Sequence, residues 1–477
     1  MAFGWPVPRV QLGSRFVRRR ARASNYIEDG LSHIVPTVEF TKRLIKNDPQ
    51  ISATFLIITS PRTPQSYIDS VTNSVTRIRF IFLPPADLPP QGTEGLSYLC
   101  IYIENHKPFV KDAVTKLISD STESTQVRLV LDMFSGSMID VGKELDIPCY
   151  VYFTSGAAML GVLLYFPKME LSLSELTLPS YENPVPVLAL PAYLLDKKSE
   201  HYAWGLKMGY YLSEAKGVIV NSVAELEARA VDAFDRLAKN YSRLYMVGPI
   251  LDLEGKTRSQ SDQAKYDQIM KWLDDQPESS VVFLCFGSRG TLSEEQNKEF
   301  ANGLEQSGHR FLWSLRRKSP GRFEPPSDFA NPEEVLPEGF LERVDGRGLI
   351  CGWAPQVDVL AHKATGAFVS HCGWNSTLES IWFGVPMLTW PLDAEQKLNA
   401  CQLVKDLGLA VQLKAVEQDF VVADDIEKGV RLIMEGGSDV RSNMKEMSEK
   451  CRKSLMEGGS SSSTLGSLIK DLNNVEV

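Results

Sequence analysis

The chain has 477 residues, of which 43% are hydrophobic and 23% charged, and its formal net charge is −9. This length suits two domains of ordinary size, and the composition is typical of a soluble globular protein. The negative charge argues against nucleic acid as a partner, because nucleic-acid binding needs clustered positive charge. Seven cysteines without a CxxC pair predict free thiols in a reducing compartment.

The first 32 residues differ in character from the rest of the chain. Before the first acidic residue, Glu28, the segment carries six arginines, namely Arg9, Arg15, Arg18, Arg19, Arg20 and Arg22. Such a start resembles an organelle transit peptide. The alternative, which we favour, is a solvated tail or a start produced by an unusual transcript or gene model, and it predicts a cytoplasmic protein.

Apolar runs alternate with helical patterns from His33 onward, which predicts parallel sheets covered by helices on both faces. The expected strands are 53–58, 78–83, 129–131, 150–153, 217–220, 244–247, 281–286, 311–315, 349–352, 366–370 and 385–390.

The alternating pattern is interrupted once, by the polar segment 251–264, which we interpret as a linker. We therefore expect an α/β protein with two Rossmann-like, doubly wound domains facing each other across a cleft, at 33–250 and 265–457. The remaining residues, 458–477, are predicted to form a flexible GGSSSS segment and a C-terminal helix.

Residues 149–167 carry no charge and are long enough to span a membrane. They start with the β-rich sequence CYVYF and continue through Thr154, Ser155 and Gly156. We therefore predict a strand, a turn and a helix here, and no membrane span.

Residues 353–396 carry the strongest functional signal. A strand over 366–370 feeds a helix over 374–383 through a glycine-containing turn, so free N–H groups and the helix dipole create an anion site. His371, Asn375 and Ser376 lie at this turn and can donate hydrogen bonds to phosphate oxygens.

The stretch resembles the signature box of plant secondary-product UDP-glycosyltransferases, from WAPQ through HCGWNS to the closing EQ. The resemblance implies a GT-B fold with the donor held by the second domain, and UDP-glucose as the donor because the last box residue is glutamine. It implies contacts to uracil from Trp353 and Ala354, to ribose from Gln356 and Glu379, to the diphosphate from His371, Asn375 and Ser376, and to the sugar from Trp374, Glu395 and Gln396.

Transfer of a sugar to a hydroxyl needs a base for the hydroxyl proton, and histidine is suited to this role near neutral pH. His33 lies in SHIVPTVEF, which resembles the family's GHxxP segment, and Asp132 matches the carboxylate that partners the catalytic histidine. Thr154 matches a donor-sugar contact and Ser288 a phosphate contact. Without the resemblance, His33 could be a surface residue and Asp132 a turn-capping residue.

No DxD triplet occurs in the chain. We therefore expect metal-independent, inverting transfer without a cofactor, in which the helix N-terminus stabilises the leaving diphosphate. The predicted acceptor is a small apolar molecule with a hydroxyl, such as a phenolic, flavonoid or terpenoid. We expect Met133, Phe134, Met138 and Phe153 to line its pocket, and the protein to be a monomer.

The resemblance breaks down just before His33. The family has an apolar first strand there, whereas this chain has RRRARASNYIEDGLS, with Ser32 at the usual glycine position. We expect the strand to be missing, replaced by a weak substitute such as 15–17, or supplied in altered register, because charged residues are costly in a central strand. Activity should then be weaker than with an apolar strand.

Two other functions stay open at this point. The altered start is compatible with a UDP-sugar-binding protein that has little or no catalysis, which a turnover assay with a panel of phenols would distinguish. A nucleotide-dependent oxidoreductase is the third possibility, but no GxGxxG follows any expected strand.

Overall fold

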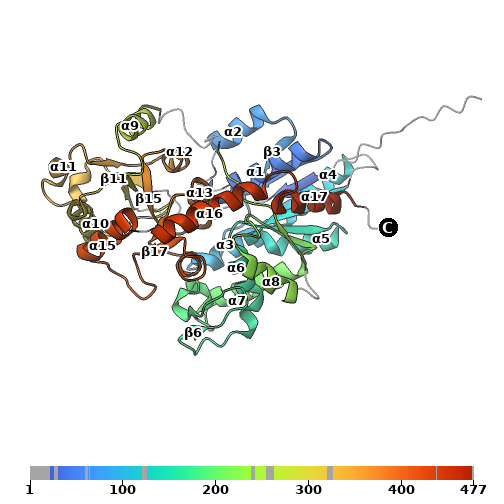
Figure 1. Cartoon of the computed structure of the whole chain (residues 1–477). Helices are drawn as coiled ribbons and strands as arrows, with labels where there is room; N and C mark the ends of the chain where they lie inside the picture. The colour runs from blue at the N-terminus through green and yellow to red at the C-terminus, as the bar shows by residue number, and fades with distance from the viewer. Residues whose placement is uncertain are drawn as a thin grey trace, which may run out of the picture.

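The computed structural model describes residues 22–25, 31–59, 63, 65–120, 126–237, 242–253, 263–319, 326–436 and 438–474. Two parallel sheets lie in two lobes, with helices packed around each sheet (Figure 1). The expected fold class, two doubly wound α/β domains, is confirmed. Most of the predicted linker, residues 254–262, and most of the first 32 residues lie outside the described part.

The first sheet has seven strands in the order β3-β2-β1-β4-β5-β8-β9, and all neighbouring pairs are parallel. Its strands are β1 (Arg22–Asn25), β2 (Ser52–Ile57), β3 (Ile78–Phe82), β4 (Val127–Asp132), β5 (Cys149–Phe153), β8 (Gly217–Val220) and β9 (Arg243–Met246). Its helices are α1 (Leu31–Asn47), α2 (Gln65–Ser74), α3 (Gly95–Glu104), α4 (Lys107–Ser119), α5 (Ile139–Glu144), α6 (Ala157–Tyr165), α7 (Glu200–Glu214) and α8 (Ala228–Leu237).

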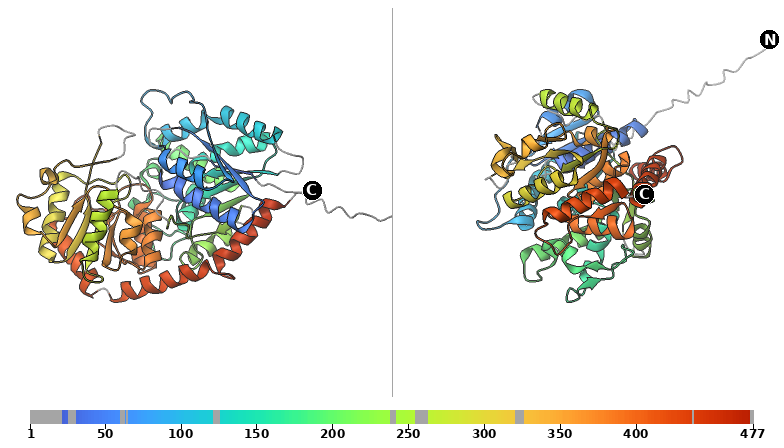
Figure 2. Two further views of the ribbon diagram at one scale, coloured as in Figure 1. Left: turned by 90° about the horizontal axis from the view of Figure 1, so that it is seen from above. Right: turned by 60° about the vertical axis from the view of Figure 1, so that its left-hand side comes forward.

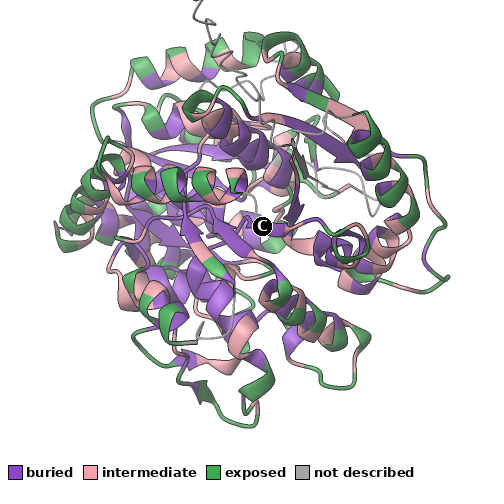
Figure 3. Cartoon of the chain, turned by 90° about the vertical axis from the view of Figure 1, so that its right-hand side faces the viewer, coloured by how far each residue is buried: buried purple, intermediate pink, exposed green. Residues whose placement is uncertain are grey.

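Both faces of this sheet are buried, because its strands are apolar at successive positions. Leu129 and Leu131 of β4 pack into one hydrophobic cluster, whereas Val130 between them packs into the cluster on the opposite face. The strands form the buried centre of each lobe and the exposed residues lie on the surrounding helices (Figure 3). This double burial explains why the strands read as continuous apolar runs.

The central strand β1 is present, although its sequence, Arg-Ala-Ser-Asn, is polar. It pairs in parallel with both β2 and β4, with Arg22 opposite Ser52 and Val127. The expectation of a missing strand is therefore wrong, and the substitute lies at 22–25 rather than at 15–17. The position of the strand follows from the length of the connection to α1, which begins at Leu31. A strand that ends at Asn25 is separated from α1 by a connection of the length usual between a strand and the following helix.

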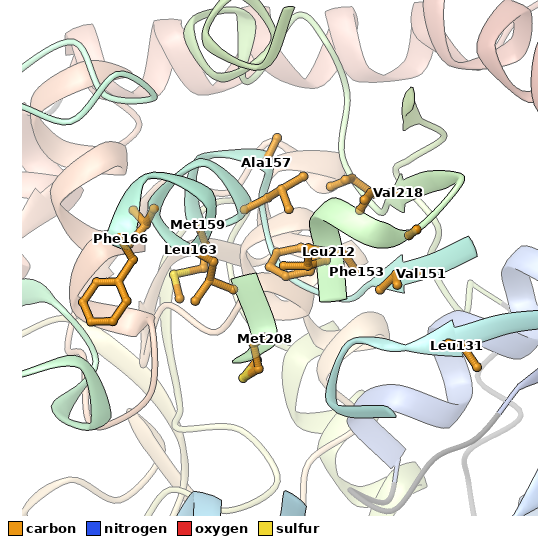
Figure 4. Close-up of a cluster of buried hydrophobic side chains, with 14 of the residues drawn as sticks. Leu131, Val151, Phe153, Ala157, Met159, Leu163, Phe166, Met208, Leu212 and Val218 are labelled. Carbon is orange, nitrogen blue, oxygen red and sulfur yellow. The ribbon is translucent and has the colours of Figure 1, made fainter. Parts of the chain in front are cut away.

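The uncharged segment 149–167 forms β5, a turn and α6, as predicted. α6 is buried almost all round, with Ala157, Met159 and Leu163 in a cluster that also contains Met208 and Leu212 of α7 (Figure 4). Across the described residues, no helix is both long and apolar enough to cross a membrane.

The second sheet has six parallel strands in the order β14-β11-β10-β15-β16-β17. These are β10 (Val281–Cys285), β11 (Arg310–Ser314), β14 (Gly348–Cys351), β15 (Thr365–Ser370), β16 (Met387–Thr389) and β17 (Ala410–Gln412). The helices around it are α9 (Gln263–Asp274), α10 (Glu294–Ser307), α11 (Phe340–Arg343), α12 (Gln356–Ala361), α13 (Trp374–Phe383), α14 (Gln396–Cys401), α15 (Ala423–Arg431) and α16 (Ser438–Ser454). Two short antiparallel pairs are additions to the main sheets: β6 (Glu175–Leu176) with β7 (Val185–Pro186), and β12 (Arg316–Arg317) with β13 (Ser327–Asp328).

The C-terminal helix α17 (Ser460–Asn473) returns to the first lobe (Figure 2). Its residues Leu465, Leu468 and Leu472 are buried in the same cluster as α1 and α2. The serines of the GGSSSS segment form the first turn of this helix rather than a flexible segment. The predicted flexible segment is therefore wrong. The sequence did not reveal this part of the helix, because the apolar residues that anchor it begin only at Leu465, after the serines.

Candidate active site

His33 and Asp132 lie at the C-terminal ends of two neighbouring strands of the first sheet, His33 in the first turn of α1, the helix that follows β1, and Asp132 at the end of β4. His33 Nδ1 lies 2.6 Å from Asp132 Oδ2, and both side chains are buried. Asp132 Oδ1 accepts a hydrogen bond from Phe134 N at 3.0 Å, so this aspartate caps the following turn and also partners the histidine.

Two further side chains border the histidine. Thr154, which follows β5, has its Oγ1 3.3 Å from His33 Nδ1. The Phe134 ring lies 5.4 Å from the imidazole, centroid to centroid. Together they form a partly apolar surrounding for a titratable ring.

Of the residues expected to line an acceptor pocket, Phe134 is partly exposed beside His33, and Met133 is partly exposed beside Thr154. Met138 and Phe153 are fully buried in the hydrophobic core, so the expectation is wrong for these two. Phe153 belongs to a strand whose faces are both covered, and Met138 points into the core from the turn after Asp132.

The N-terminus of α13 lies at the C-terminal edge of the second sheet, directly after β15. The His371 ring is held between two glycines: a Cβ at Gly287 would lie 2.6 Å from His371 Nε2, and one at Gly373 would also collide with it. Burial lowers the pKa of His371 to about 4, so its imidazole is neutral at physiological pH. Within the described part of the chain, His371 Nδ1 and Asn375 Oδ1 are buried and have no hydrogen-bond partner.

The residues expected to hold a ribose form one hydrogen-bonded network. Gln356 Nε2 donates to Glu379 Oε2 at 2.7 Å and to Ser376 Oγ at 2.8 Å, which joins the start of α12 to the first turns of α13. Burial raises the pKa of Glu379 to about 7, an effect that the Gln356 hydrogen bond opposes. Trp353 is half-buried and Ala354 buried in the loop before α12.

The other expected donor contacts lie at the same edge. Ser288 is exposed in the loop after β10. The indole of Trp374 is buried and its Nε1 donates to Asn221 O of the first domain at 2.8 Å. Gln396 Oε1 accepts from the backbone N–H groups of Leu392 and Asp393, which orients its amide.

Asn375 connects this helix to the helix that carries His33. Its Nδ2 donates to the carbonyl oxygen of Ser32 at 2.8 Å. In a regular α-helix the Ser32 carbonyl would accept from the N–H of residue 36, but that residue is Pro36 and has no N–H. The proline thus leaves an acceptor that the other domain uses.

Several residues at this interface escaped the sequence analysis. Asn221 follows β8 as Asp132 ends β4, so its place at a strand end was a usable signal. Glu227 is buried and accepts from the backbone N–H groups of Ala157 and Ala158 at the start of α6. Burial raises its pKa. Its sequence context, at the start of α8, resembles an ordinary exposed helix start and gave no signal.

Over the described ranges, no group of three His, Cys, Asp or Glu residues could hold a metal ion. The two doubly wound domains bring a His–Asp pair opposite a helix N-terminus lined with neutral hydrogen-bond donors. Two doubly wound domains with such groups between them have the architecture of the GT-B fold class, with ligands expected at the C-terminal ends of the strands.

Comparison with known proteins specifies the class further. Residues 237–451 match the family described as UDP-glucoronosyl and UDP-glucosyl transferase. The chain is 48% identical to UDP-glycosyltransferase 71K1 of Malus domestica, covering 93% of this chain and 97% of that one. It is 46% identical to flavonol 3-O-glucosyltransferase UGT71C4 of Arabidopsis thaliana, covering 92% and 95%.

A solved structure, that of Medicago truncatula UGT71G1 complexed with UDP-glucose, is similar in fold with a TM-score of 0.87. It is 39% identical and covers 96% of this chain and 99% of that one. The chain belongs to the UDP-glycosyltransferases of plant secondary metabolism, and the resemblance seen in residues 353–396 is confirmed.

Proposed function

We propose that this enzyme transfers glucose from UDP-glucose to a hydroxyl of a flavonoid or related phenolic, with inversion at the anomeric carbon and without a metal ion. The observation that carries the proposal is the 2.6 Å contact between His33 and Asp132, opposite the N-terminus of α13. Relatives named as glucosyltransferases, and a relative named for a flavonol acceptor, support the donor and acceptor class.

The donor is assigned to the second domain, residues 265–457, with Trp353 and Ala354 at uracil. Gln356 and Glu379 receive the ribose hydroxyls, and Ser288 contributes a phosphate contact. The unpartnered polar atoms of His371 and Asn375, with Ser376, suit the diphosphate, because buried polar groups are normally hydrogen-bonded. Thr154, Trp374, Glu395 and Gln396 contact the sugar.

In the proposed reaction the acceptor oxygen forms a bond to the anomeric carbon while the bond from that carbon to the phosphate oxygen breaks. Asp132 holds the proton of His33 on Nδ1, so the lone pair on Nε2 takes the hydroxyl proton. UDP leaves with its charge facing the α13 N-terminus and its N–H groups. A neutral His371 donates a hydrogen bond there without requiring a protonated ring.

The acceptor is assigned to the first domain, residues 33–250. Phe134 lies beside His33 and can face the ring of a phenol whose hydroxyl points at the imidazole. The alternative, a UDP-sugar-binding protein with impaired or no catalysis, rests on the altered first strand. The polar β1 still pairs with both β2 and β4, which supports an intact first sheet and so favours the enzyme.

The test is to replace His33 by alanine and to measure product by mass spectrometry with UDP-glucose and a panel of phenols. We expect turnover to fall by about 10²- to 10⁴-fold, the usual contribution of a positioned base, with UDP affinity unchanged. His309→Ala, at a histidine paired with Glu435 at the surface of the second domain, is the control and should retain activity. Wild-type binding of UDP-glucose without product for any phenol would support the alternative.

A further inference from the structure

The loop Thr154–Gly156 touches functional groups of both domains through successive residues. Thr154 Oγ1 lies 3.3 Å from His33 Nδ1 in the first domain. Ser155 Oγ donates a hydrogen bond to Glu395 Oε1 of the second domain at 3.1 Å. The proposed base and a proposed sugar-binding carboxylate are thus contacted by neighbouring side chains.

Ser155 is held firmly in place. It is 3% exposed, and the residues after it begin α6, whose first N–H groups are bound by the carboxylate of Glu227. On the other side, a Cβ at Gly156 would lie 2.9 Å from the Trp374 ring, so the loop is also fitted against the second domain. The backbone at Ser155 is therefore fixed from both sides, with its hydroxyl directed at Glu395.

The Ser155 hydroxyl orients the Glu395 carboxylate through Oε1 and leaves Oε2 for another hydrogen-bond donor. The residue is half-buried at the N-cap of α14, with no side-chain bond to that helix. Apart from the Ser155 contact to Oε1, neither carboxylate oxygen accepts a hydrogen bond from any residue that the structure describes, which leaves Oε2 for a hydroxyl group. A carboxylate with one oxygen tied is restricted in rotation and so costs less entropy when it binds a ligand.

We propose that Ser155 is a positioning residue for donor-sugar recognition: it holds Glu395 across the domain interface so that Oε2 accepts a hydrogen bond from a hydroxyl of the donor hexose. This inference rests on the proposed function, which assigns Glu395 to the sugar. It adds that sugar recognition depends on a first-domain residue that does not itself touch the donor.

The same hydrogen bond could act only as a latch between the domains. A latch would strengthen binding of UDP and UDP-glucose equally, because both nucleotides lie against the second domain and gain equally from closure. A positioning residue affects only the ligand that carries the hexose. The difference between the affinities for UDP and UDP-glucose therefore separates the two roles.

The experiment measures the affinities of UDP and UDP-glucose by calorimetry for wild type, Ser155→Ala, Glu395→Gln and the double variant. We expect Ser155→Ala to bind UDP-glucose about fivefold more weakly, as for the loss of one hydrogen bond, and UDP unchanged. In the Glu395→Gln background, Ser155→Ala should have little further effect, because the two residues act as a unit. Preference for UDP-glucose over UDP-galactose should narrow in both single variants.

Ser180→Ala is the matched control, since Ser180 is a buried serine of the same domain whose Oγ donates to Ala158 O of α6. It should leave both affinities unchanged. Three outcomes would overturn this inference without affecting the proposed function. Ser155→Ala could weaken UDP and UDP-glucose binding equally, or the two substitutions could have fully additive effects in the double variant. In the third outcome, Ser155→Ala has no effect while Glu395→Gln loses affinity for UDP-glucose. If Glu395→Gln itself bound UDP-glucose normally, the assignment of Glu395 in the proposed function would fail instead.

Discussion

Single side chains in this protein have chemical properties that depend on their surroundings more than on their type. His371 lies in the turn before α13 and Glu379 lies on that helix, and burial shifts both side chains toward the neutral form. The pKa of His371 falls to about 4 and that of Glu379 rises to about 7. Of these two groups, only Glu379 changes charge between pH 6 and pH 8. The pH dependence of ligand affinity can therefore test the proposed ribose site.

We predict that affinity for uridine increases as the pH rises from 6 to 8. Below pH 7 the Glu379 carboxyl is protonated; above it, the carboxylate accepts stronger hydrogen bonds from ribose hydroxyls. The expected gain is about fivefold, the difference between a neutral and a charge-assisted hydrogen bond. Uridine is the ligand of choice because it has no phosphate that titrates in this range.

Glu379→Gln should bind uridine with the same, weaker affinity at every pH in this interval. A pH slope that persists in Glu379→Gln would assign the titration to another group and contradict the prediction. Calorimetry at fixed ionic strength measures both proteins.

At the scale of elements, the two helices nearest the proposed reaction are joined by a hydrogen bond that a proline makes available. Pro36 cannot donate to the Ser32 carbonyl, and Asn375 of α13 does so instead. This exchange gives up one bond inside α1 and gains one between the domains. It links the helix that carries His33 to the helix that is proposed to bind the diphosphate.

We predict that Pro36→Ala lowers kcat about fivefold, because the new N–H competes with Asn375 for the Ser32 carbonyl and loosens His33 relative to the donor. Steady-state kinetics at saturating UDP-glucose provide the measurement. Pro108→Ala, at the first turn of α4, is the matched control, because a first-turn N–H has no partner within its helix in any case. An unchanged kcat in Pro36→Ala, with the protein folded, would argue against this role of the proline.

Across the whole molecule, the chain crosses between the lobes more than once. It passes from the first domain to the second before α9, and α17 then returns to pack on the first domain. Arg243 of β9 pairs with Asp471 of α17 at 2.7 Å, but this pair is at the surface and contributes little. The buried leucines of α17 therefore supply most of the attachment.

We predict that Leu468→Ala destabilises the first lobe by about 2–5 kcal/mol, the usual cost of truncating a buried leucine. Backbone amide hydrogen exchange should become faster in β2 and β9, whose side chains lie in the same hydrophobic cluster as the α17 leucines. It should change little in β10 and β11 of the second lobe. Lys470→Ala, at an exposed position of the same helix, is the control and should alter stability by less than about 0.5 kcal/mol. Equal acceleration of exchange in both lobes would mean that they unfold as one unit.

What could be predicted from the sequence was largely local. The helix over 374–383, the apolar strands and the strand-turn-helix at 149–167 follow from hydrophobic periodicity and glycine-containing turns, which depend on neighbouring residues. β17 was not predicted because its sequence, Ala-Val-Gln, contains only two consecutive apolar residues and so gives no apolar run, unlike the equally short β16 inside the run 385–390. β1 was placed wrongly because a polar sequence carries no apolar pattern, while its backbone can still pair with two neighbours.

Most of the proposed donor contacts could be named from one continuous stretch, 353–396, since the strand, turn and helix that carry them are consecutive in the chain; Thr154 and Ser288 lie outside it. Only the tertiary structure decided which groups meet across the two domains: Ser155 with Glu395, Asn375 with the Ser32 carbonyl, and Trp374 with Asn221. These partners are separated by 153 to 343 residues. Hydrogen bonds over such separations leave no periodic trace in sequence, because they depend on how the two domains dock.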